Sequence, residues 1–448
     1  MRSLRNALAA CAGSALHAPR TSVPFAALAR GVNLDAPLDA LAGRSVLLAT
    51  ADQTRAAMAM VALDGVARRL VLAPPDLLAG GLASVARDAE IEVAVVDDEG
   101  GAGDLAVASV RALDAPRPVD AEAPAETSTE WVLATSGSTG APKLVSHSLA
   151  GLAGAIDTRC PPPPGTVWST FYDIRRYGGL QVFLRAVLGP SSLVVCDPRE
   201  ALGDFLHRAS AAGLTHLLGT PSHWRRALMS PALAMLRPRY VRLSGEIADQ
   251  AILDRLKAAF PEAVVAHAYA STEAGVGFSV DDGREGFPAT VLGAHEGIEI
   301  HVREDRLHVR SPRTGRRYLG PDAPYLMGDD GFVDTGDRVE RRGERYVFLG
   351  RASGVINVGG AKVQPEEVEA VLHADPQIQA VRVSGRRNPI LGAIVVADVV
   401  LRPGVEASCA LRETLLDRCR STLARHKVPT RLAFVETLPL SAGGKLVR

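Results

Sequence analysis

The stretch Thr135-Ser136-Gly137-Ser138-Thr139-Gly140-Ala141-Pro142-Lys143 directly follows an apolar run at residues 131–134. Its glycines let backbone N–H groups turn toward an anion, its hydroxyls add donors, and Lys143 adds positive charge. A loop of this composition can also be no more than a flexible turn. The preceding strand and the closing Pro-Lys pair favour phosphate binding. Because no Gly-Lys-Ser/Thr ends the run, it is not the loop of a Walker-type ATPase.

The sequence on both sides of this loop alternates short apolar runs with helical segments. Strands are predicted at residues 45–50, 69–73, 91–96, 131–134, 192–196, 214–219, 240–244 and 263–268, with helices at 51–66 and 201–212. Apolar strands separated by helices are typical of a parallel sheet covered on both faces. Ligands bind beyond the carboxyl ends of such strands, and every motif described below lies at such an end.

The pattern changes to a period of two near residue 290, where Ile298, Ile300 and Val302 alternate with polar residues. This predicts an antiparallel sheet with one exposed face. After a last strand at 346–350, a helix is expected to start at Pro365, followed by a strand at 390–401 and a helix at 410–424. Residues 114–128, rich in proline, alanine and acids, are predicted to be an exposed linker.

These segments predict an α/β protein of two domains. Residues 1–350 are expected to form a large N-terminal domain, with parallel, helix-covered sheets and a small β subdomain. Residues 351–448 are expected to form a small α+β C-terminal domain, joined to the first by a hinge. A chain of 448 residues is long enough for two or three domains.

Composition narrows the function classes. Lys plus Arg and Asp plus Glu each number 50, which gives no reason to expect nucleic acid or an anionic membrane as a partner. Five widely spaced cysteines without a C-x-x-C argue against a disulfide framework or a zinc site and favour a reducing, cytoplasmic location. No apolar run approaches the length of a membrane span, and the Ala-rich N-terminus is expected to be a helix rather than a signal peptide.

Four more motifs follow the loop along the chain. They are Ala268-Tyr269-Ala270-Ser271-Thr272-Glu273, Asp334-Thr335-Gly336-Asp337, Gly350-Arg351-Ala352-Ser353-Gly354-Val355-Ile356-Asn357-Val358-Gly359-Gly360-Ala361-Lys362-Val363 and Pro439-Leu440-Ser441-Ala442-Gly443-Gly444-Lys445. Taken singly, each has an ordinary interpretation, such as a helix start, an acidic β-turn or a solvated lysine near a C-terminus.

The run Ser-Gly-Ser-Thr-Gly-Ala-Pro-Lys resembles the phosphate loop of the adenylate-forming superfamily. That superfamily includes acyl-CoA synthetases, adenylation domains of non-ribosomal peptide synthetases and firefly luciferase. The five motifs occur in the family's order and approximate spacing, so the chain is identified as a member. The part before the phosphate loop is short for the family, which predicts a trimmed N-terminal subdomain.

The resemblance implies a role for residues in each motif. The expected ATP-binding residues are Thr135, Ser136, Gly137, Ser138, Thr139, Gly140, Lys143, His267, Tyr269, Asp337 and Arg351. Tyr269 would stack on adenine, and Asp337 would accept hydrogen bonds from the ribose hydroxyls. Thr272 would touch phosphate and Glu273 would hold Mg²⁺, because a hard cation prefers carboxylate and phosphate oxygens. Lys445 would be the catalytic lysine, with Glu273 and Thr272 as its catalytic partners.

The fourth motif resembles the family's hinge and the loop that approaches the thiol. Gly359 and Gly360 would let that loop lie close to a pantetheine chain. The hinge residue is usually Asp, sometimes Lys, and here it is Ser353. A lysine that is frequent four residues further on is replaced by Asn357. These two departures leave the energetics of the hinge open.

The acid-binding pocket is predicted from the strand ends. Its expected residues are Tyr172, Arg176, Tyr177, Gly178, Gly219, Thr220, Ser244, Gly245, Glu246 and Ala268. Asp173 resembles the aspartate that binds the α-amino group in amino-acid-activating relatives, but it is misplaced by about three residues. Arg175 or Arg176 could bind a second acidic group or lie at the surface, and His267 could reach the adenine edge or be a satisfied core histidine.

The resemblance implies a reaction in two halves. A small or medium carboxylic acid would react with MgATP to give an acyl-adenylate and pyrophosphate, and a thiol would then displace AMP. The motif around Gly359 favours CoA as the thiol, with the phosphopantetheine of a separate carrier protein as the alternative. A degenerate, non-catalytic nucleotide-binding protein is the rival of another class. The retention of Lys143, Glu273, Asp337, Arg351 and Lys445 argues against it.

Overall fold

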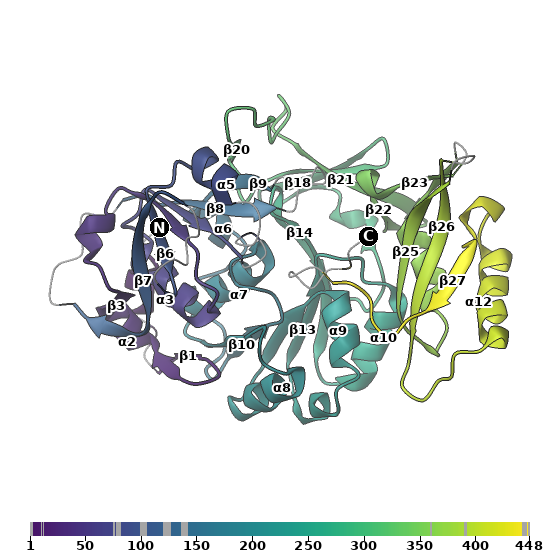
Figure 1. Ribbon diagram of the computed structural model, residues 1–448, viewed down its shortest axis with the longest axis horizontal. Coiled ribbons are helices and arrows are strands. Elements are labelled where there is room, and N and C mark those ends of the chain that lie inside the picture. The colour runs from purple at the N-terminus through teal and green to yellow at the C-terminus, as the bar shows by residue number, and fades with distance from the viewer. Residues whose placement is uncertain are drawn as a thin grey trace.

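The computed structural model describes residues 3–9, 11, 13–74, 77, 82–98, 105–119, 127–135, 142–358, 361–388, 392–440 and 446. These residues form four β-sheets with helices packed on them. Figure 1 shows the two largest sheets and the six-stranded sheet together, with a smaller sheet and its helices at one end of the molecule. The predicted α/β class, with a large N-terminal and a small C-terminal part, is confirmed.

The first sheet, called here the N-terminal sheet, surrounds the strand that leads into the phosphate loop. Its order is β20 (Arg317–Leu319), β9 (Lys143–Ser148), β8 (Glu130–Thr135), β5 (Arg69–Leu72), β4 (Ser45–Leu48), β6 (Val93–Val96), β7 (Ala108–Pro118) and β3 (Gly31–Leu34). The strands from β8 to β7 are parallel, while β9, β20 and β3 are antiparallel to their neighbours.

The second sheet, called here the central sheet, carries most of the predicted pocket. Its order is β15 (Gly275–Val280), β14 (Val264–Ser271), β13 (Tyr240–Ser244), β12 (His216–Gly219), β10 (Val167–Thr170), β11 (Ser192–Val194), β1 (Ala15–His17) and β2 (Ser22–Pro24). Its strands from β14 to β1 run parallel, so their carboxyl ends meet along one edge.

The largest core cluster fills the space between these two sheets. It contains α3 (Gln53–Leu63) and α7 (Tyr177–Leu188) together with residues of β4, β5, β8, β11 and β12. Every residue of α3 except Arg55 is buried, as expected of a helix that is largely apolar all round. Its first turn is fixed by Asp52, whose side chain accepts from the backbone N–H groups of Thr54 and Arg55.

Further helices cover the outer faces of both sheets. On the central sheet these are α8 (Leu202–Ala211), α9 (Pro221–Ala227) and α10 (Gln250–Ala259), which share a core with Val241 and Leu243 of β13. On the N-terminal sheet, α5 (Leu82–Asp88) packs on residues of β4, β5 and β6. The remaining short helices of the described N-terminal part are α1 (Leu4–Leu8), α2 (Phe25–Arg30) and α6 (Leu149–Ala153).

The six-stranded sheet forms the β subdomain, in the order β16 (Phe287–Pro288), β22 (Arg345–Arg351), β21 (Val333–Arg342), β19 (Arg306–Arg310), β18 (Ile298–Arg303) and β17 (Gly293–His295). Its described strands pair antiparallel with their neighbours. Ile298 and Ile300 are buried between more exposed neighbours, which agrees with the predicted alternation.

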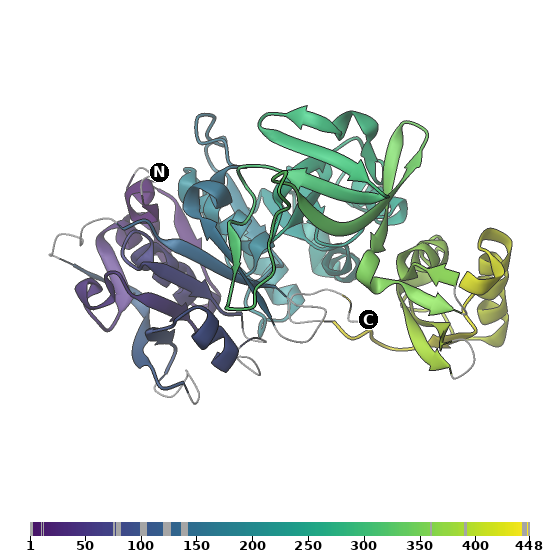
Figure 2. The ribbon, with the colours of Figure 1, turned by 90° about the horizontal axis from the view of Figure 1, so that it is seen from above.

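The C-terminal sheet has the order β24 (Ala361–Val363), β23 (Ile356–Val358), β26 (Gly392–Leu401) and β25 (Ile378–Asn388), with β27 (Arg431–Phe434) beside β26. It packs with α11 (Pro365–His373) and α12 (Cys409–Thr422) around its own core. Figure 2 shows this unit at one end of the molecule, opposite the N-terminal sheet. After β27 the chain runs back toward α9 and α10 (Figure 1).

One sequence expectation needs correction, and another is confirmed over a shorter range. The predicted linker at residues 114–128 is partly strand, because β7 continues to Pro118 and pairs with β3 at the sheet edge. Its exposed side chains explain the polar composition. The N-terminal helix is confirmed but short, at Leu4–Leu8, and the next residues add β1 and β2 to the central sheet.

Candidate active site

Three residues from separate motifs meet where β14 faces the β subdomain. The hydroxyl of Tyr269, on β14, donates to Oδ2 of Asp337 at 2.7 Å. Nε of Arg351 donates to Oδ1 of the same carboxylate at 3.2 Å. Asp337 and Arg351 face each other across β21 and β22, because they are paired in the ladder. The predicted tyrosine, aspartate and arginine therefore form one connected group.

Aromatic packing fixes the ring of Tyr269. Phe278 lies 5.6 Å from it, centroid to centroid, at 20°, and Phe348 lies 5.5 Å away at 11°. Burial, and then the charge of Asp337, raises the pKa of Tyr269 well above its usual value, so the phenol remains a neutral donor. Its predicted contact with adenine remains a prediction.

A second group forms around Tyr318 of β20. Its hydroxyl donates to Oε1 of Glu273 at 3.3 Å, and Nζ of Lys143 lies 5.3 Å from the centre of its ring. A positive and a negative side chain thus flank one phenol, whose pKa is raised by burial and then by Glu273. The charge of Glu273 also acts on Arg351, which connects this group to the first one.

The chemistry of Glu273 fits a magnesium ion bound mainly through phosphate. No cluster of three or more His, Cys, Asp and Glu side chains suited to a metal occurs in the described part of the chain. Mg²⁺ commonly uses one or two carboxylates and completes its shell with water and substrate phosphates. A single carboxylate beside Lys143 matches that mode. Thr272 and Glu273 lie in the turn between β14 and β15, which Ser271 closes by accepting from the N–H of Ala274 at 2.9 Å.

The phosphate loop is anchored at its two ends. Thr135 ends β8 and pairs with Lys143, the first residue of β9. Its hydroxyl donates to the carbonyl of Lys143 at 3.4 Å. The other predicted loop residues, Ser136, Gly137, Ser138, Thr139 and Gly140, lie outside the described residues, as do Gly359, Gly360 and Lys445.

The predicted acid pocket centres on Tyr172. This buried side chain donates to the carbonyl of Ser244 at 2.7 Å, and its hydroxyl lies 2.9 Å from Oγ of Ser244. A Cβ on Gly178 would sit 3.4 Å from the Tyr172 ring, in ordinary van der Waals contact with it. Ala268 pairs in register with Ser244 on the neighbouring strand. Gly245 continues from Ser244 with a φ of +83°.

The remaining pocket candidates have structural partners. Tyr177 is buried at the start of α7, with its ring 5.9 Å from that of His147. Gly219 ends β12, where a Cβ would come within 2.7 Å of Phe171. Thr220 caps α9 by accepting from the N–H of His223 at 3.0 Å. Arg176 is the residue before α7 and is half-buried.

Glu246 connects the pocket edge to the C-terminal tail. Its carboxylate accepts from the backbone N–H of Ser222 at 2.9 Å, from the Ser222 hydroxyl at 3.0 Å and from the backbone N–H of Leu446 at 3.2 Å. Leu446 is the residue that follows Lys445 in the sequence. It also forms a bridge with Leu440. Sequence reasoning predicted Glu246 as a pocket residue but had no signal for this tail contact.

The open interpretations of His267, Asp173 and Arg175 can be compared with their contacts. Nε2 of His267 donates to the carbonyl of Arg284 at 3.0 Å, and burial lowers its pKa, as for a satisfied core histidine. Arg175 is not at the surface: it is 1% exposed and pairs with Asp173 at 2.5 Å. Both residues are therefore already bound to each other.

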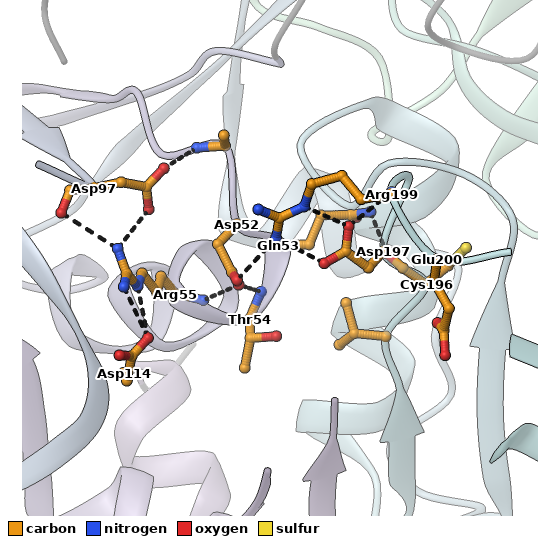
Figure 3. A network of polar contacts seen from close by, with 12 residues as sticks. Asp52, Gln53, Thr54, Arg55, Asp97, Asp114, Cys196, Asp197, Arg199 and Glu200 are labelled. Carbon is orange, nitrogen blue, oxygen red and sulfur yellow. Dashed lines mark hydrogen bonds and ion pairs between the residues drawn. The ribbon is translucent and has the colours of Figure 1, made fainter. Parts of the chain in front are cut away.

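This pair belongs to a hydrogen-bond network that holds the segment beside the predicted pocket. Arg175 also donates to the carbonyls of Thr50 and Ala51, just before α3. Gln53 donates to the carbonyl of Cys196 and accepts from the N–H of Ile174 at 2.8 Å. Figure 3 shows the wider network around the start of α3, which joins loops of the N-terminal and central sheets. The segment from Tyr172 to Tyr177 is thus held by contacts that no local sequence pattern indicated.

The predicted hinge residue Ser353 lies in a short 3₁₀ turn, Ala352–Gly354, between β22 and β23. This turn connects Arg351, in the group around Asp337, to the C-terminal sheet. No helix in the part of the chain that the structure describes is long and apolar enough to cross a membrane.

Two parts of the chain match a known family of enzymes. The AMP-binding enzyme family matches residues 36–317, and the AMP-binding enzyme C-terminal domain matches residues 367–445. The p-hydroxybenzoic acid–AMP ligase FadD22 of Mycobacterium tuberculosis is 28% identical over 337 residues, which cover 70% of this chain and 47% of FadD22. The chain thus spans about half the length of that relative. The 2-succinylbenzoate–CoA ligase of Geobacillus kaustophilus is 34% identical over 170 residues, 37% of this chain and 34% of that protein.

Solved structures support the same fold. The anthranilate CoA ligase AuaEII, in complex with anthranoyl-AMP, superposes with a TM-score of 0.81 over 99% of this chain and 95% of that chain, at 19% identity. ATP-bound MatB from Rhodopseudomonas palustris gives a TM-score of 0.77 over 99% of this chain and 97% of that chain, at 22% identity. With the two family matches and the predicted motifs in order, the chain belongs to the AMP-binding enzyme family, within the adenylate-forming superfamily.

Proposed function

We propose that this protein activates a carboxylic acid with MgATP as an acyl-adenylate, releases pyrophosphate, and transfers the acyl group to the thiol of CoA. The observation that carries the proposal is the meeting of Tyr269, Asp337 and Arg351 beside Glu273. A carboxylate that can accept from ribose hydroxyls and a second carboxylate that can hold Mg²⁺, with a tyrosine hydrogen-bonded to the first of them, are the kinds of side chain that MgATP would need.

In the first half-reaction, a carboxylate oxygen of the acid attacks the α-phosphorus of ATP and pyrophosphate leaves. Asp337 would hold the ribose, and Lys143 with the phosphate loop would hold the phosphates. Glu273 would hold Mg²⁺, which when bound neutralises charge on the phosphates. Lys445 would bridge the acid carboxylate and the α-phosphate, where negative charges meet in the transition state. Its neighbour Leu446 is bound to Glu246 at the pocket edge, which supports this assignment.

In the second half-reaction, the thiol sulfur attacks the carbonyl carbon, the bond from that carbon to the adenylate oxygen breaks, and AMP leaves. We propose that the C-terminal domain, residues 351–448, turns about Ser353 between the two halves. That movement would withdraw Lys445 and bring Gly359 and Gly360 toward the thiol. The short turn Ala352–Gly354, which follows Arg351 and precedes the C-terminal sheet, supports Ser353 as the hinge.

CoA is favoured over a carrier protein by the names of several relatives. The acetyl-coenzyme A synthetase of Bacillus subtilis is 33% identical over 139 residues, and the succinylbenzoate and anthranilate enzymes are CoA ligases. The alternative acceptor, a carrier-bound phosphopantetheine, is supported by similarity to CymA of Salinispora arenicola, a probable non-canonical non-ribosomal peptide synthetase, at 27% identity over 345 residues.

The proposal is tested by acid-dependent exchange of pyrophosphate into ATP, over a panel of amino, aryl, dicarboxylic and fatty acids. Exchange with one class, lowered by about 10²-fold or more in Lys445→Ala, is expected. CoA, or a carrier protein with a free phosphopantetheine thiol, is then added to the enzyme with ATP and the acid that supports exchange. The acceptor is the thiol on which a thioester forms. ATP binding without exchange for any acid would contradict the proposal and favour a degenerate nucleotide-binding protein.

A further inference from the structure

Arg242 is a buried charge in the middle of the central sheet. Along β13, Val241 and Leu243 belong to the core shared with α8, α9 and α10. Since side chains alternate along a strand, Tyr240, Arg242 and Ser244 point to the opposite face, toward Tyr172, which bonds to Ser244. Arg242 thus lies on the pocket face, two residues before Ser244. It is 9% exposed.

Arg242 lacks the carboxylate that the other buried arginines have. Among the described residues, four arginines are buried. Arg69 pairs with Glu130 at 2.7 Å, Arg175 with Asp173 and Arg345 with Asp282, both at 2.5 Å. Arg242 has no described carboxylate within ion-pairing distance, and its buried Nε has no hydrogen-bond partner. Its in-register neighbours on β12 and β14 are Leu218 and Ala266, which are apolar.

Two further arginines increase the positive charge on this face. Within the described residues, Arg185 of α7 donates to neutral acceptors alone, namely the carbonyls of Gln181 and Ala155 and the Gln181 side chain, at 3.0 to 3.2 Å. Burial, and then the charge of Arg242, lowers the pKa of Arg185 to about 9. The charge of Arg313 also lowers the pKa of Arg185. Arg313 itself donates to the carbonyl of Val276 at 3.3 Å. Tyr177, at the start of the same helix as Arg185, is buried.

A largely buried guanidinium with no carboxylate beside it and a buried Nε without a hydrogen-bond partner is costly, since such a charge normally requires a partner. The cost is removed if an anion binds there with the substrate. Because a strand rises about 3.3 Å per residue, Arg242 lies roughly 7 Å back along β13 from Ser244, the last residue of the strand. An anion at Arg242 would therefore be separated from a reacting carboxylate near the strand end by the body of a small acid.

We infer that the acid activated by this protein carries a second carboxylate, which Arg242 binds. The substrate class is then a dicarboxylic acid. One carboxylate reacts with ATP, and the other is bound by Arg242 on the pocket face of the central sheet. This inference rests on the proposed adenylation of an acid. It replaces Arg175 as an expected binder of a second acidic group, because Arg175 is already paired with Asp173.

The test compares diacids with their monomethyl esters, which keep the carbon skeleton and lose one charge. Benzene-1,4-dicarboxylate and hexanedioate are measured against these half-esters in pyrophosphate exchange. We expect kcat/KM for the preferred diacid to exceed that of its half-ester by about 10²-fold, as for a lost buried charge pair. In Arg242→Met the diacid should lose about 10²-fold and the half-ester should gain. Arg237→Met, at an exposed arginine, should change neither.

Thermal unfolding separates this role from a structural one. If Arg242 only supports the fold, Arg242→Met lowers the unfolding temperature. If it awaits an anion, the variant without ligand is as stable as the wild type or more stable, because an unpaired buried charge is gone. The diacid alone should raise the unfolding temperature of the wild type and not that of Arg242→Met.

The outcomes distinguish this inference from the proposed function. Exchange that is equal for diacids and half-esters, and unchanged in Arg242→Met, overturns the inference and leaves adenylation intact. A diacid-dependent thermal shift that Arg242→Met abolishes, without exchange for any acid, supports the inference and contradicts adenylation. The absence of both exchange and thermal shift overturns both.

Discussion

The contact between Glu246 and Leu446 makes a sharp prediction about which half of the reaction needs the C-terminal tail. The Glu246 carboxylate accepts from three donors, two on Ser222 and the backbone N–H of Leu446 at 3.2 Å. In Glu246→Gln one of the two acceptor oxygens becomes an amide N–H group. At least one of the three donors then faces another donor, and the charge that strengthened all three bonds is lost.

The expected magnitude follows from these bonds. A hydrogen bond to a charged group contributes about 1.5–3 kcal/mol. Glu246 is half-buried and the tail bond is long, so we take about 1–2 kcal/mol for the tail, in the lower part of the range for hydrogen bonds. Converted at 1.36 kcal/mol per factor of ten, this lowers the rate of adenylation by about 5- to 30-fold. Glu246→Ala should lower it further, since no acceptor remains.

The assay measures the two half-reactions separately. Adenylation is followed by pyrophosphate exchange, and thioester formation is followed from a supplied acyl-adenylate with CoA. We expect Glu246→Gln to slow only the first. Ser222→Ala is the matched control, because it removes one partner of Glu246 and leaves the tail bond in place. Equal loss in both half-reactions, or exchange as fast as in the wild type, would refute the reasoning.

Three further substitutions test other parts of the site. Tyr269→Phe keeps the ring beside Phe278 and Phe348 but removes the donor to Asp337. The KM for ATP should therefore rise by about 10-fold, and by more in Tyr269→Ala. An unchanged KM would show that this bond does not order Asp337. Gly179→Ala would place a Cβ 2.2 Å from the carbonyl oxygen of Asp173. Calorimetry should therefore find a loss of about 1–3 kcal/mol in the free energy of unfolding, and kinetics should find a higher KM for the acid. Wild-type values for both would contradict this, because they would mean that the backbone shifts without cost. Burial lowers the pKa of His147 from 6.5 to about 4, so the unfolded state binds its proton first, and the stabilisation present above about pH 6.5 is lost as the pH falls toward 4. Denaturant unfolding should therefore show a steeper decline over this range for the wild type than for His147→Leu, by up to about 1.4 kcal/mol per pH unit, and parallel declines would contradict the assignment.

The parallel sheets could be predicted because their strands are short, apolar and buried on both faces. The predicted strand at 240–244 agrees with β13 (Tyr240–Ser244), and that at 69–73 agrees with β5 to within one residue. The helix predicted at 51–66 begins at Gln53, because Asp52 caps it. The strands that the N-terminal residues add to the central sheet could not be predicted. Leu16 of β1 pairs with Leu193 of β11, far along the chain, and no local pattern announces such a contact.

The site divides in the same way. Tyr269, Asp337 and Arg351 could be named from their motifs, and the structure brings them together. Tyr318, by contrast, lies in no motif and joins Glu273 only because β20 pairs with β9. The unpaired state of Arg242 likewise depends on which residues surround it in three dimensions, and a sequence does not state that.

The central claim, that the acid is activated at the α-phosphate of ATP, is tested most directly by isotope transfer. The preferred acid is labelled with ¹⁸O in its carboxylate and converted with ATP and CoA, and the AMP is analysed by mass spectrometry. The account predicts one ¹⁸O atom in the AMP. The carboxylate oxygen that attacked the α-phosphorus stays on that phosphorus when the thiol attacks the acyl carbon and AMP leaves. Label in inorganic phosphate, or AMP formed without label, would contradict the acyl-adenylate.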